Sequence, residues 1–153
     1  MIEPEAEAEM RISDVLATKG RTVATVLPTD TVEQALRQLV ALRIGAVVVE
    51  DRWQALVGIF SERDLVRLLA QEGPAVLHRE LQKVMTHNVI TCSAHDRIDD
   101  ILRVMTMNKI RHVPVLDNGK LAGIVSIGDL VSNRLEEKQQ EAEVLLEIAR
   151  MRG

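Results

Sequence analysis

The sequence predicts an α/β fold in which two tandem β-α-β-β-α repeats, related by a pseudo-two-fold axis, precede a C-terminal helix. The first observation is internal similarity, because residues 30–51 match residues 96–117 and residues 58–66 match residues 123–131. The latter pair of segments is identical at six of nine positions. The second observation is composition: 46% of the residues are hydrophobic and only 1% are aromatic. Aliphatic side chains must therefore fill a core between helices and sheets.

Each copy is expected to open with a short strand followed by an amphipathic helix. The β-branched runs at 23–26 and 89–91 predict the two strands. Acidic residues at both ends of 30–33 and 96–99 resemble capping boxes, and the apolar residues that follow recur at helical spacing. A helix is therefore predicted after each of these boxes.

The rest of each copy reads as two strands and a second helix. Apolar runs at 46–49 and 112–115 predict strands, each followed by a turn and a returning strand. Pro114 cannot donate a ladder hydrogen bond, so its strand is expected at a sheet edge or with that N–H side unpaired. The second helices should begin at Ser61 and Ser126, because each serine precedes an aspartate by three positions.

These elements divide the chain into four predicted parts. An acidic N-terminal extension covers residues 1–10, the repeats cover 11–75 and 76–135, and a C-terminal helix covers 136–153. The last helix carries an apolar stripe at Val144–Ala149, which predicts a docking or dimerising surface.

Composition also excludes several classes of protein. The ends hold nine of 23 acidic and three of 19 basic residues, so residues 11–135 are nearly neutral, which disfavours nucleic-acid binding. No apolar run predicts a membrane span, and the acidic start is unlike a signal peptide, so a cytoplasmic location is expected. With Cys92 as the single cysteine, and no histidine pair at helical spacing, we expect neither a disulfide within the chain nor a metal site.

The Ser61-x-x-Asp64 and Ser126-x-x-Asp129 turns have two interpretations. Serine at a helix N-cap with an acid at N3 is a common start signal, so each turn alone is readily explained as a cap. However, both copies carry the turn in register after a Gly-containing strand, and a strand-to-helix turn presents free N–H groups to phosphate. The serine hydroxyl suits a phosphate oxygen, and the carboxylate suits the two hydroxyls of a ribose.

The segments GAVVVED…GIFSERDLV and RHVPVLDNGKLAGIVSIGDLV resemble a pair of cystathionine-β-synthase (CBS) domains, a Bateman module, over roughly residues 11–135. The run KGRTVATVLPTDTV also resembles small stand-alone bacterial proteins with two CBS domains. The resemblance implies an adenosine-ligand module with two clefts between the repeats. It also implies dimerisation through helix faces.

By this resemblance, the serines of the two turns would bind the phosphate of the ligand, and the aspartates would bind its ribose. Adenine would lie against the strand starts at 45–47 and 111–113. Residues 19–23 and 89–91 would form the other walls of the clefts. The expected ligand-binding residues are Lys19, Val23, Gly45, Ala46, Val47, Ser61, Arg63, Asp64, Val89, Thr91, Arg111, His112, Val113, Ser126 and Asp129.

The two sites are not expected to be equivalent. Arg63 beside the first turn is a candidate phosphate contact, whereas the second turn has Gly128 at that place. Conversely, Arg111 and His112 begin a strand where the first copy has small residues. The first site therefore suits an extended di- or polyphosphate, and the second a monophosphate. Arg63 and Arg111 are equally well explained as solvated side chains at the end of a helix or a strand.

The function expected is a non-catalytic sensor that binds an adenine nucleotide such as AMP, ADP, ATP or NAD and requires no other cofactor. Ligand binding would shift the population of repeat or dimer arrangements, which an unidentified regulated protein reads. The alternative is a structural or interaction protein whose turns are only caps. An enzyme is not expected, because the sequence contains no pairing of nucleophile and base.

Overall fold

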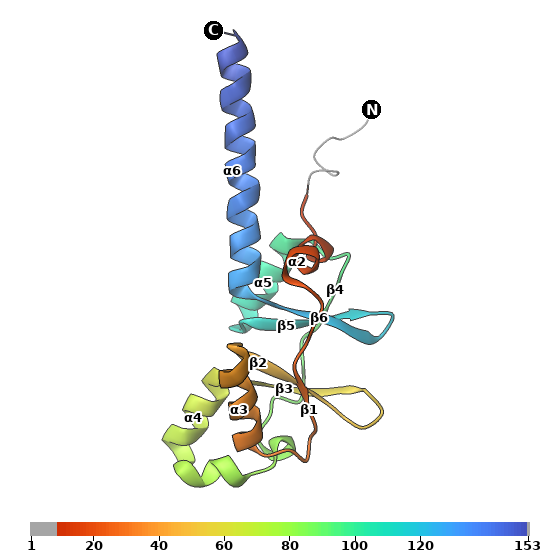
Figure 1. The fold of residues 1–153 in the computed structure, drawn as a ribbon, viewed down its shortest axis with the longest axis vertical. Coiled ribbons are helices and arrows are strands. Elements are labelled where there is room, and N and C mark those ends of the chain that lie inside the picture. The colour runs from red at the N-terminus through yellow and green to blue at the C-terminus, as the bar shows by residue number, and fades with distance from the viewer. Residues whose placement is uncertain (1–8, 153) are drawn as a thin grey trace. The chain divides into compact units, whose positions relative to one another are not determined.

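The computed structural model describes residues 9–152, so all but the last two residues of the predicted acidic extension lie outside the described part. Figure 1 shows the elements along the chain. In order they are α2 (Ile12–Lys19), β1 (Thr25–Val26), α3 (Val32–Leu42), β2 (Ala46–Glu50), β3 (Leu56–Ser61), α4 (Glu62–Glu72), the 3-10 helices η1 (Pro74–His78) and η2 (Leu81–Lys83), β4 (Cys92–Ser93), α5 (Ile98–Asn108), β5 (His112–Asp117), β6 (Lys120–Ser126) and α6 (Ile127–Arg152). The β-α-β-β-α order occurs twice, which confirms the predicted fold class.

The chain forms two compact units whose segments are interleaved along the sequence. One unit, the first-repeat unit, contains residues 22–91 and 116–122. The other, the second-repeat unit, contains the described residues up to Arg21, together with 92–115 and 123–152. Helix α2 lies at the start of the predicted first repeat, 11–75, yet belongs to the second-repeat unit. The predicted domain limits, which follow sequence order, stay a prediction.

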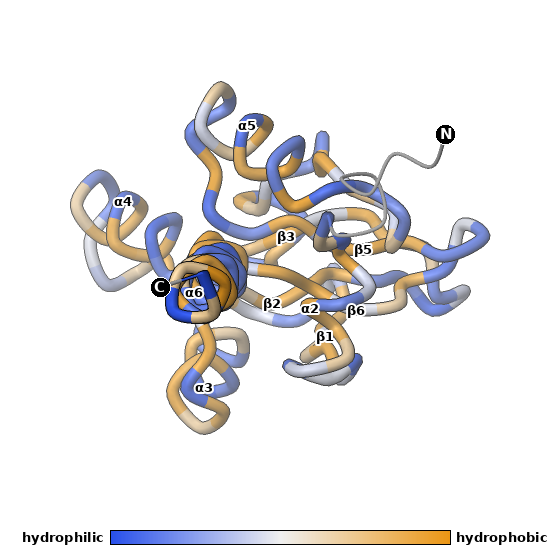
Figure 2. Tube along the Cα trace, turned by 90° about the horizontal axis from the view of Figure 1, so that it is seen from above, coloured by the Kyte–Doolittle hydropathy of each residue, from blue (hydrophilic) through white to orange (hydrophobic). Residues whose placement is uncertain are grey.

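The first-repeat unit is built on a three-stranded sheet in the order β1-β2-β3. Strand β1 is parallel to β2, and β2 is antiparallel to β3 with a bulge between Val49 and Glu50. The strands supply hydrophobic stretches, seen in orange in Figure 2. Its buried core is Val26, Val32, Ala35, Leu39, Val47, Val49, Phe60, Leu65, Leu68, Val76, Leu81 and Met85.

The second sheet has the order β4-β5-β6, and all of it except the end of the β5–β6 hairpin at 116–122 belongs to the second-repeat unit, whose core also includes residues of α2. Strand β5 lies in the middle, so Pro114 is not on an edge strand. Strand β4 comprises Cys92 and Ser93, rather than the predicted 89–91, because Cys92 is the first buried side chain in this stretch. Its buried core is Ile12, Val15, Leu16, Cys92, Ile98, Ile101, Met105, Val113, Val115, Val125 and Leu130.

The N-caps of α3 and α5 lie one residue later than predicted. Thr31 is the N-cap: its hydroxyl accepts from the Gln34 N–H at 3.3 Å, and the Gln34 side chain accepts from the Thr31 N–H at 2.7 Å. The predicted caps, Asp30 and Asp96, instead accept a backbone N–H from the residue three positions earlier, at 2.8 Å in each case. Their carboxylates close the preceding turn, and each N-cap falls one residue later: Thr31 caps α3 with its side chain, whereas Arg97 makes no side-chain cap hydrogen bond to α5.

Helix α6 is one continuous helix of 26 residues that begins directly after Ser126. It therefore joins the predicted second helix of the repeat to the predicted C-terminal helix without a break. Figure 1 shows it continuing past α2 and α5 of its own unit. The apolar stripe Val144–Ala149 is exposed, with Leu145 67% and Ile148 44% accessible. Within residues 9–152, no helix has the length and apolar character needed to cross a bilayer.

Cys92 is buried in the second-repeat unit. Its burial, aided by the negative charge of Asp96, raises the pKa of the thiol from 9.0 to about 12. Because the thiolate is the reactive form, this cysteine stays protonated and unreactive at neutral pH. In the described part of the chain, no three acidic, histidine or cysteine side chains converge as metal ligands would.

Candidate functional site

The first Ser-x-x-Asp turn joins β3 to α4 and forms a complete capping box. The Ser61 hydroxyl accepts from the Asp64 N–H at 3.3 Å, while the Asp64 carboxylate accepts from the Ser61 N–H at 2.9 Å and its hydroxyl at 3.0 Å. Asp64 is only 9% exposed. Its second oxygen pairs with Arg67 at 2.9 Å. Sequence reasoning missed Arg67, although its i,i+3 spacing from Asp64 was a usable signal.

The second turn joins β6 to α6 with the same backbone pattern. The Asp129 carboxylate accepts from the Ser126 N–H at 2.8 Å, and the Ser126 hydroxyl accepts from the Asp129 N–H at 3.1 Å. Here the carboxylate also pairs with Lys19 from α2, with Nζ and Oδ2 2.6 Å apart. Burial alone would raise the pKa of Asp129, but hydrogen bonds from Lys19 and Ser126 outweigh it and lower the pKa below 3.8.

Each turn lies next to the start of a strand from the same repeat. The Glu62 N–H donates to the Gly45 carbonyl at 3.0 Å, and the Ile127 N–H donates to the Arg111 carbonyl at 2.8 Å. Ala46 is also the register partner of Ser61. The structure therefore brings the predicted strand-start residues to the predicted turn in both units.

The strand-start residues differ in what they can present to a ligand. Ala46 is 6% exposed, and Val47 and Val113 are 0% exposed with their backbone included. Arg111 is exposed and His112 is half-buried. Arg111 and His112 are therefore the strand-start residues of the second unit that solvent reaches.

Arg63 lies within the first turn, and three other predicted residues lie outside both turns. Arg63 is exposed on the first turn of α4. Val23, Val89 and Thr91 lie in irregular, half-buried segments. In the region that the structure describes, none of these three donates or accepts a hydrogen bond at either turn. The role of these and of the other predicted site residues in ligand binding stays a prediction.

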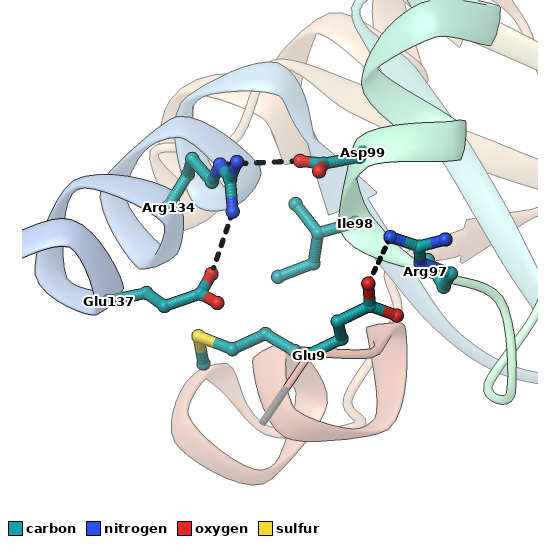
Figure 3. Close-up of a pocket in the computed structure, with 7 residues that line it drawn as sticks. Glu9, Arg97, Ile98, Asp99, Arg134 and Glu137 are labelled. Atoms are coloured by element: carbon teal, nitrogen blue, oxygen red, sulfur yellow. Dashed lines mark hydrogen bonds and ion pairs between the residues drawn. The ribbon is translucent and has the colours of Figure 1, made fainter. Parts of the chain in front are cut away.

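A cluster of charged side chains lies near the base of α6 (Figure 3). Arg134 contacts Asp99 at 3.3 Å and Glu137 at 3.1 Å, and Arg97 pairs with Glu9. The cavity among them holds about 10 Å³, which accommodates about one water molecule. The ion pair between Arg134 and Asp99 links α6 to α5, and the cavity is too small to hold a nucleotide.

A larger hollow of about 330 Å³ lies between α3 and α4. It is lined by Leu36, Leu39, Val40, Arg43, Ile44, Gly45, Glu62 and Leu65. Its lining includes Gly45 but neither serine nor aspartate of the turns. The hollow therefore borders the first turn through Gly45 and Glu62 without including its serine or aspartate.

Two repeats of this fold, each ending in the same serine–aspartate turn, define a tandem CBS pair. The sequence model of the CBS domain matches residues 12–71 and 80–136, so the chain belongs to the CBS domain family and contains two copies of the domain. This confirms the resemblance predicted from the two repeated segments.

Relatives with known sequences and structures share most of the chain. A crystal structure of a CBS-domain containing protein from Agrobacterium tumefaciens is 45% identical, covers 82% of this chain and 99% of that protein, and superposes with a TM-score of 0.80. A mitochondrial CBS domain-containing protein of Arabidopsis thaliana is 32% identical over 88% of this chain and 69% of its own length. The Bacillus subtilis protein YlbB is 33% identical over 86% and 88%, respectively.

Two similar structures contain adenosine compounds. A CBS domain protein from Pyrobaculum aerophilum, complexed with AMP, is 29% identical, covers 78% of this chain and 89% of that chain, and has a TM-score of 0.70. The CBS domain pair of protein MJ0100, complexed with 5-methylthioadenosine and S-adenosyl-L-methionine, is 26% identical, covers 85% and 98%, and has a TM-score of 0.74.

Proposed function

We propose that this chain is a regulatory, non-catalytic module that binds an adenine nucleotide at its serine–aspartate turns. The observation that carries the proposal is the repeated turn itself. In each unit a serine hydroxyl, a carboxylate and the start of a hydrophobic strand converge at one helix N-terminus. The adenosine compounds bound by the similar structures support this ligand class.

The chemistry of the turn suits the two polar parts of a nucleotide. The serine hydroxyl and the first N–H groups of α4 or α6 would meet phosphate, which the positive end of the helix dipole favours. The aspartate would accept hydrogen bonds from the ribose hydroxyls. Both groups now serve the capping box, so the ligand exchanges internal hydrogen bonds for its own. Binding therefore changes the start of a helix, and a regulated protein can read this change as a population shift.

The first turn is the better candidate for ADP, ATP or NAD, because exposed Arg63 adds a positive charge beside Ser61. The second turn is the better candidate for AMP. Titration of each ligand into the protein decides this assignment.

The alternative function is that of a structural or interaction protein. The capping boxes favour it, because both serine–aspartate pairs already satisfy each other within the chain. In that case an Asp→Ala change lowers the melting temperature through loss of the cap, by an amount equivalent to about 0.5–2 kcal/mol, and does not alter ligand affinity.

Isothermal titration calorimetry with AMP, ADP, ATP and NAD tests the proposal. We expect Asp64→Ala and Asp129→Ala each to weaken one binding event by about 10- to 100-fold, because a hydrogen bond to a charged group contributes about 1.5–3 kcal/mol. Asp96→Ala is the matched control, because it removes a similar i−3 backbone hydrogen bond outside the predicted site. The absence of binding by all four ligands at millimolar concentration would overturn the proposed function.

We also propose that the protein forms a homodimer through the exposed stripe Val144–Ala149 on α6. A second antiparallel copy is the occupant that the charges favour. Glu141 and Arg152 lie in line with the stripe at its two ends, so each would fall beside the opposite charge of the other copy. Pairing would also cover Leu145 and Ile148, which the single chain leaves exposed.

Replacing Leu145 with glutamate is expected to convert the dimer to a monomer, since it places a charge at the centre of the stripe. Leu146→Glu introduces the same charge at a side chain that is 58% exposed and about 100° further round the helix. Light scattering at micromolar concentration should therefore show a dimer for the unmodified protein and for Leu146→Glu. A monomeric unmodified protein would contradict this proposal.

A further inference from the structure

We propose that Lys19 makes the second turn selective for adenosine ligands that carry a phosphate, and against neutral nucleosides. In the absence of ligand its ammonium group pairs with the Asp129 carboxylate, and a ligand phosphate replaces that carboxylate as its partner. This inference rests on the proposed function and specifies which ligands the second turn accepts.

The contact lies within the second-repeat unit. Lys19 Nζ donates to Asp129 Oδ2 at 2.6 Å and to the carbonyl oxygen of Ile124 at 2.8 Å. These partners lie on α6 and β6, whereas Lys19 is the last residue of α2 and is 110 positions from Asp129 in sequence. The lysine side chain is 34% exposed and that of Asp129 is 26% exposed, so both groups can be reached from solvent.

The first turn is arranged differently. Its aspartate, Asp64, pairs with Arg67 from the same helix, and that pair uses Oδ1. The oxygen that caps Ser61 is the other one, Oδ2. At the second turn, a single oxygen of Asp129 receives both the Ser126 N–H and the lysine. Lys19 and the Ser126 N–H therefore share Oδ2, the same oxygen of Asp129.

The charge balance determines which ligand can take this place. A ribose that hydrogen bonds to Asp129 weakens the ion pair, and a neutral nucleoside returns no negative charge to the ammonium group. A nucleotide does return one, because its phosphate at the α6 N-terminus would lie within reach of the flexible lysine. Charge-assisted bonds of this kind are stronger than neutral ones. Binding of a nucleoside therefore weakens the Lys19–Asp129 ion pair without compensation. Binding of a nucleotide replaces it with an ion pair between Lys19 and the phosphate.

AMP and adenosine are the probes that isolate this effect, because they share base and ribose and differ in the phosphate. Both are titrated in the Asp64→Ala background, so that the second turn is the site observed. With Lys19 present, we expect AMP to bind at least tenfold more tightly than adenosine. With Lys19→Met, AMP affinity should fall about tenfold and adenosine affinity should not fall, so the preference disappears.

The matched control is Lys120→Met, which removes the same charge at the far end of β6 from Ser126. It should leave the AMP preference unchanged. Lys19→Gln serves as a second variant if Lys19→Met lowers the melting temperature. NMR titration of Asp129 adds a readout without ligand: its pKa should rise in Lys19→Met, because the hydrogen bond from Lys19 helps to lower it against the effect of burial.

An AMP preference that persists within twofold in Lys19→Met overturns the inference and leaves the proposed function intact. If adenosine binds as tightly as AMP when Lys19 is present, the inference is also overturned and the proposed function stays intact. Failure of both compounds to bind the unmodified protein overturns the proposed function itself, and this inference with it.

Discussion

Replacing Phe60 with alanine is expected to lower the free energy of unfolding of the first-repeat unit by about 3–5 kcal/mol. Phe60 is the single phenylalanine of the chain, and its side chain is 0% exposed. It lies on β3, in the core that includes Val47, Leu65 and Met85. The loss combines the transfer free energy of the ring with a cavity that aliphatic neighbours fill poorly. Urea denaturation followed by circular dichroism measures it.

Trp53→Ala is the control for Phe60→Ala, because it also removes an aromatic ring. Trp53 is 73% exposed in the β2–β3 turn, where it stacks with Arg52 at 4.4 Å. A solvated cation–π contact contributes about 0.5–1 kcal/mol, so its loss should be small. Equal destabilisation by the two variants would mean that burial of Phe60 is not what stabilises this unit.

Replacing Leu16 with alanine is expected to lower the free energy of unfolding of the second-repeat unit by about 2–5 kcal/mol. Leu16 is 1% exposed and lies over Gly123 on β6. A methyl group built on Gly123 would approach the Leu16 side chain to 2.7 Å. The leucine therefore fills the space that this glycine leaves, and truncation opens a cavity there. Hydrogen exchange in β5 and β6 should accelerate, which locates the loss in this unit.

Thr18→Ala tests whether the α2 helix itself, rather than the buried leucine, accounts for the effect. Thr18 is exposed on α2, and its replacement should change stability by no more than about 0.5 kcal/mol. The double variant with Gly123→Ala adds a sharper test. Gly123→Ala should destabilise the protein alone but be tolerated beside Leu16→Ala, because the new methyl group occupies the vacated space. Simple additivity of the two changes would contradict this packing.

The repeat explains why much of the fold was predictable. Similarity between residues 30–51 and 96–117 supplied the order of elements twice, so each copy supported the interpretation of the other. Local signals were less exact. Strand β4 lies beyond the predicted 89–91 because burial, which propensity does not report, begins at Cys92. The cap of α3 lies at Thr31 because the Asp30 carboxylate is engaged by the preceding turn.

The candidate site was predictable in its turns but not in its partners. Ser61 and Ser126 could be placed at helix starts from spacing alone, and both are found there. The pairing of Lys19 with Asp129 could not be predicted, because it depends on α2 packing in the unit of the second repeat. Lys19 and Asp129 are 110 positions apart, and a local sequence pattern cannot predict a contact at that separation.

The continuity of α6 turns a small local change into a large displacement. A helix of 26 residues is about 39 Å long, and this one starts at the turn that is proposed to bind the ligand. If a ligand tilted its first turn by about 10°, the far end would move by roughly 7 Å relative to the turn. The helix would then act as a lever, with Ser126 at its fulcrum and the exposed stripe Val144–Ala149 on its moving arm.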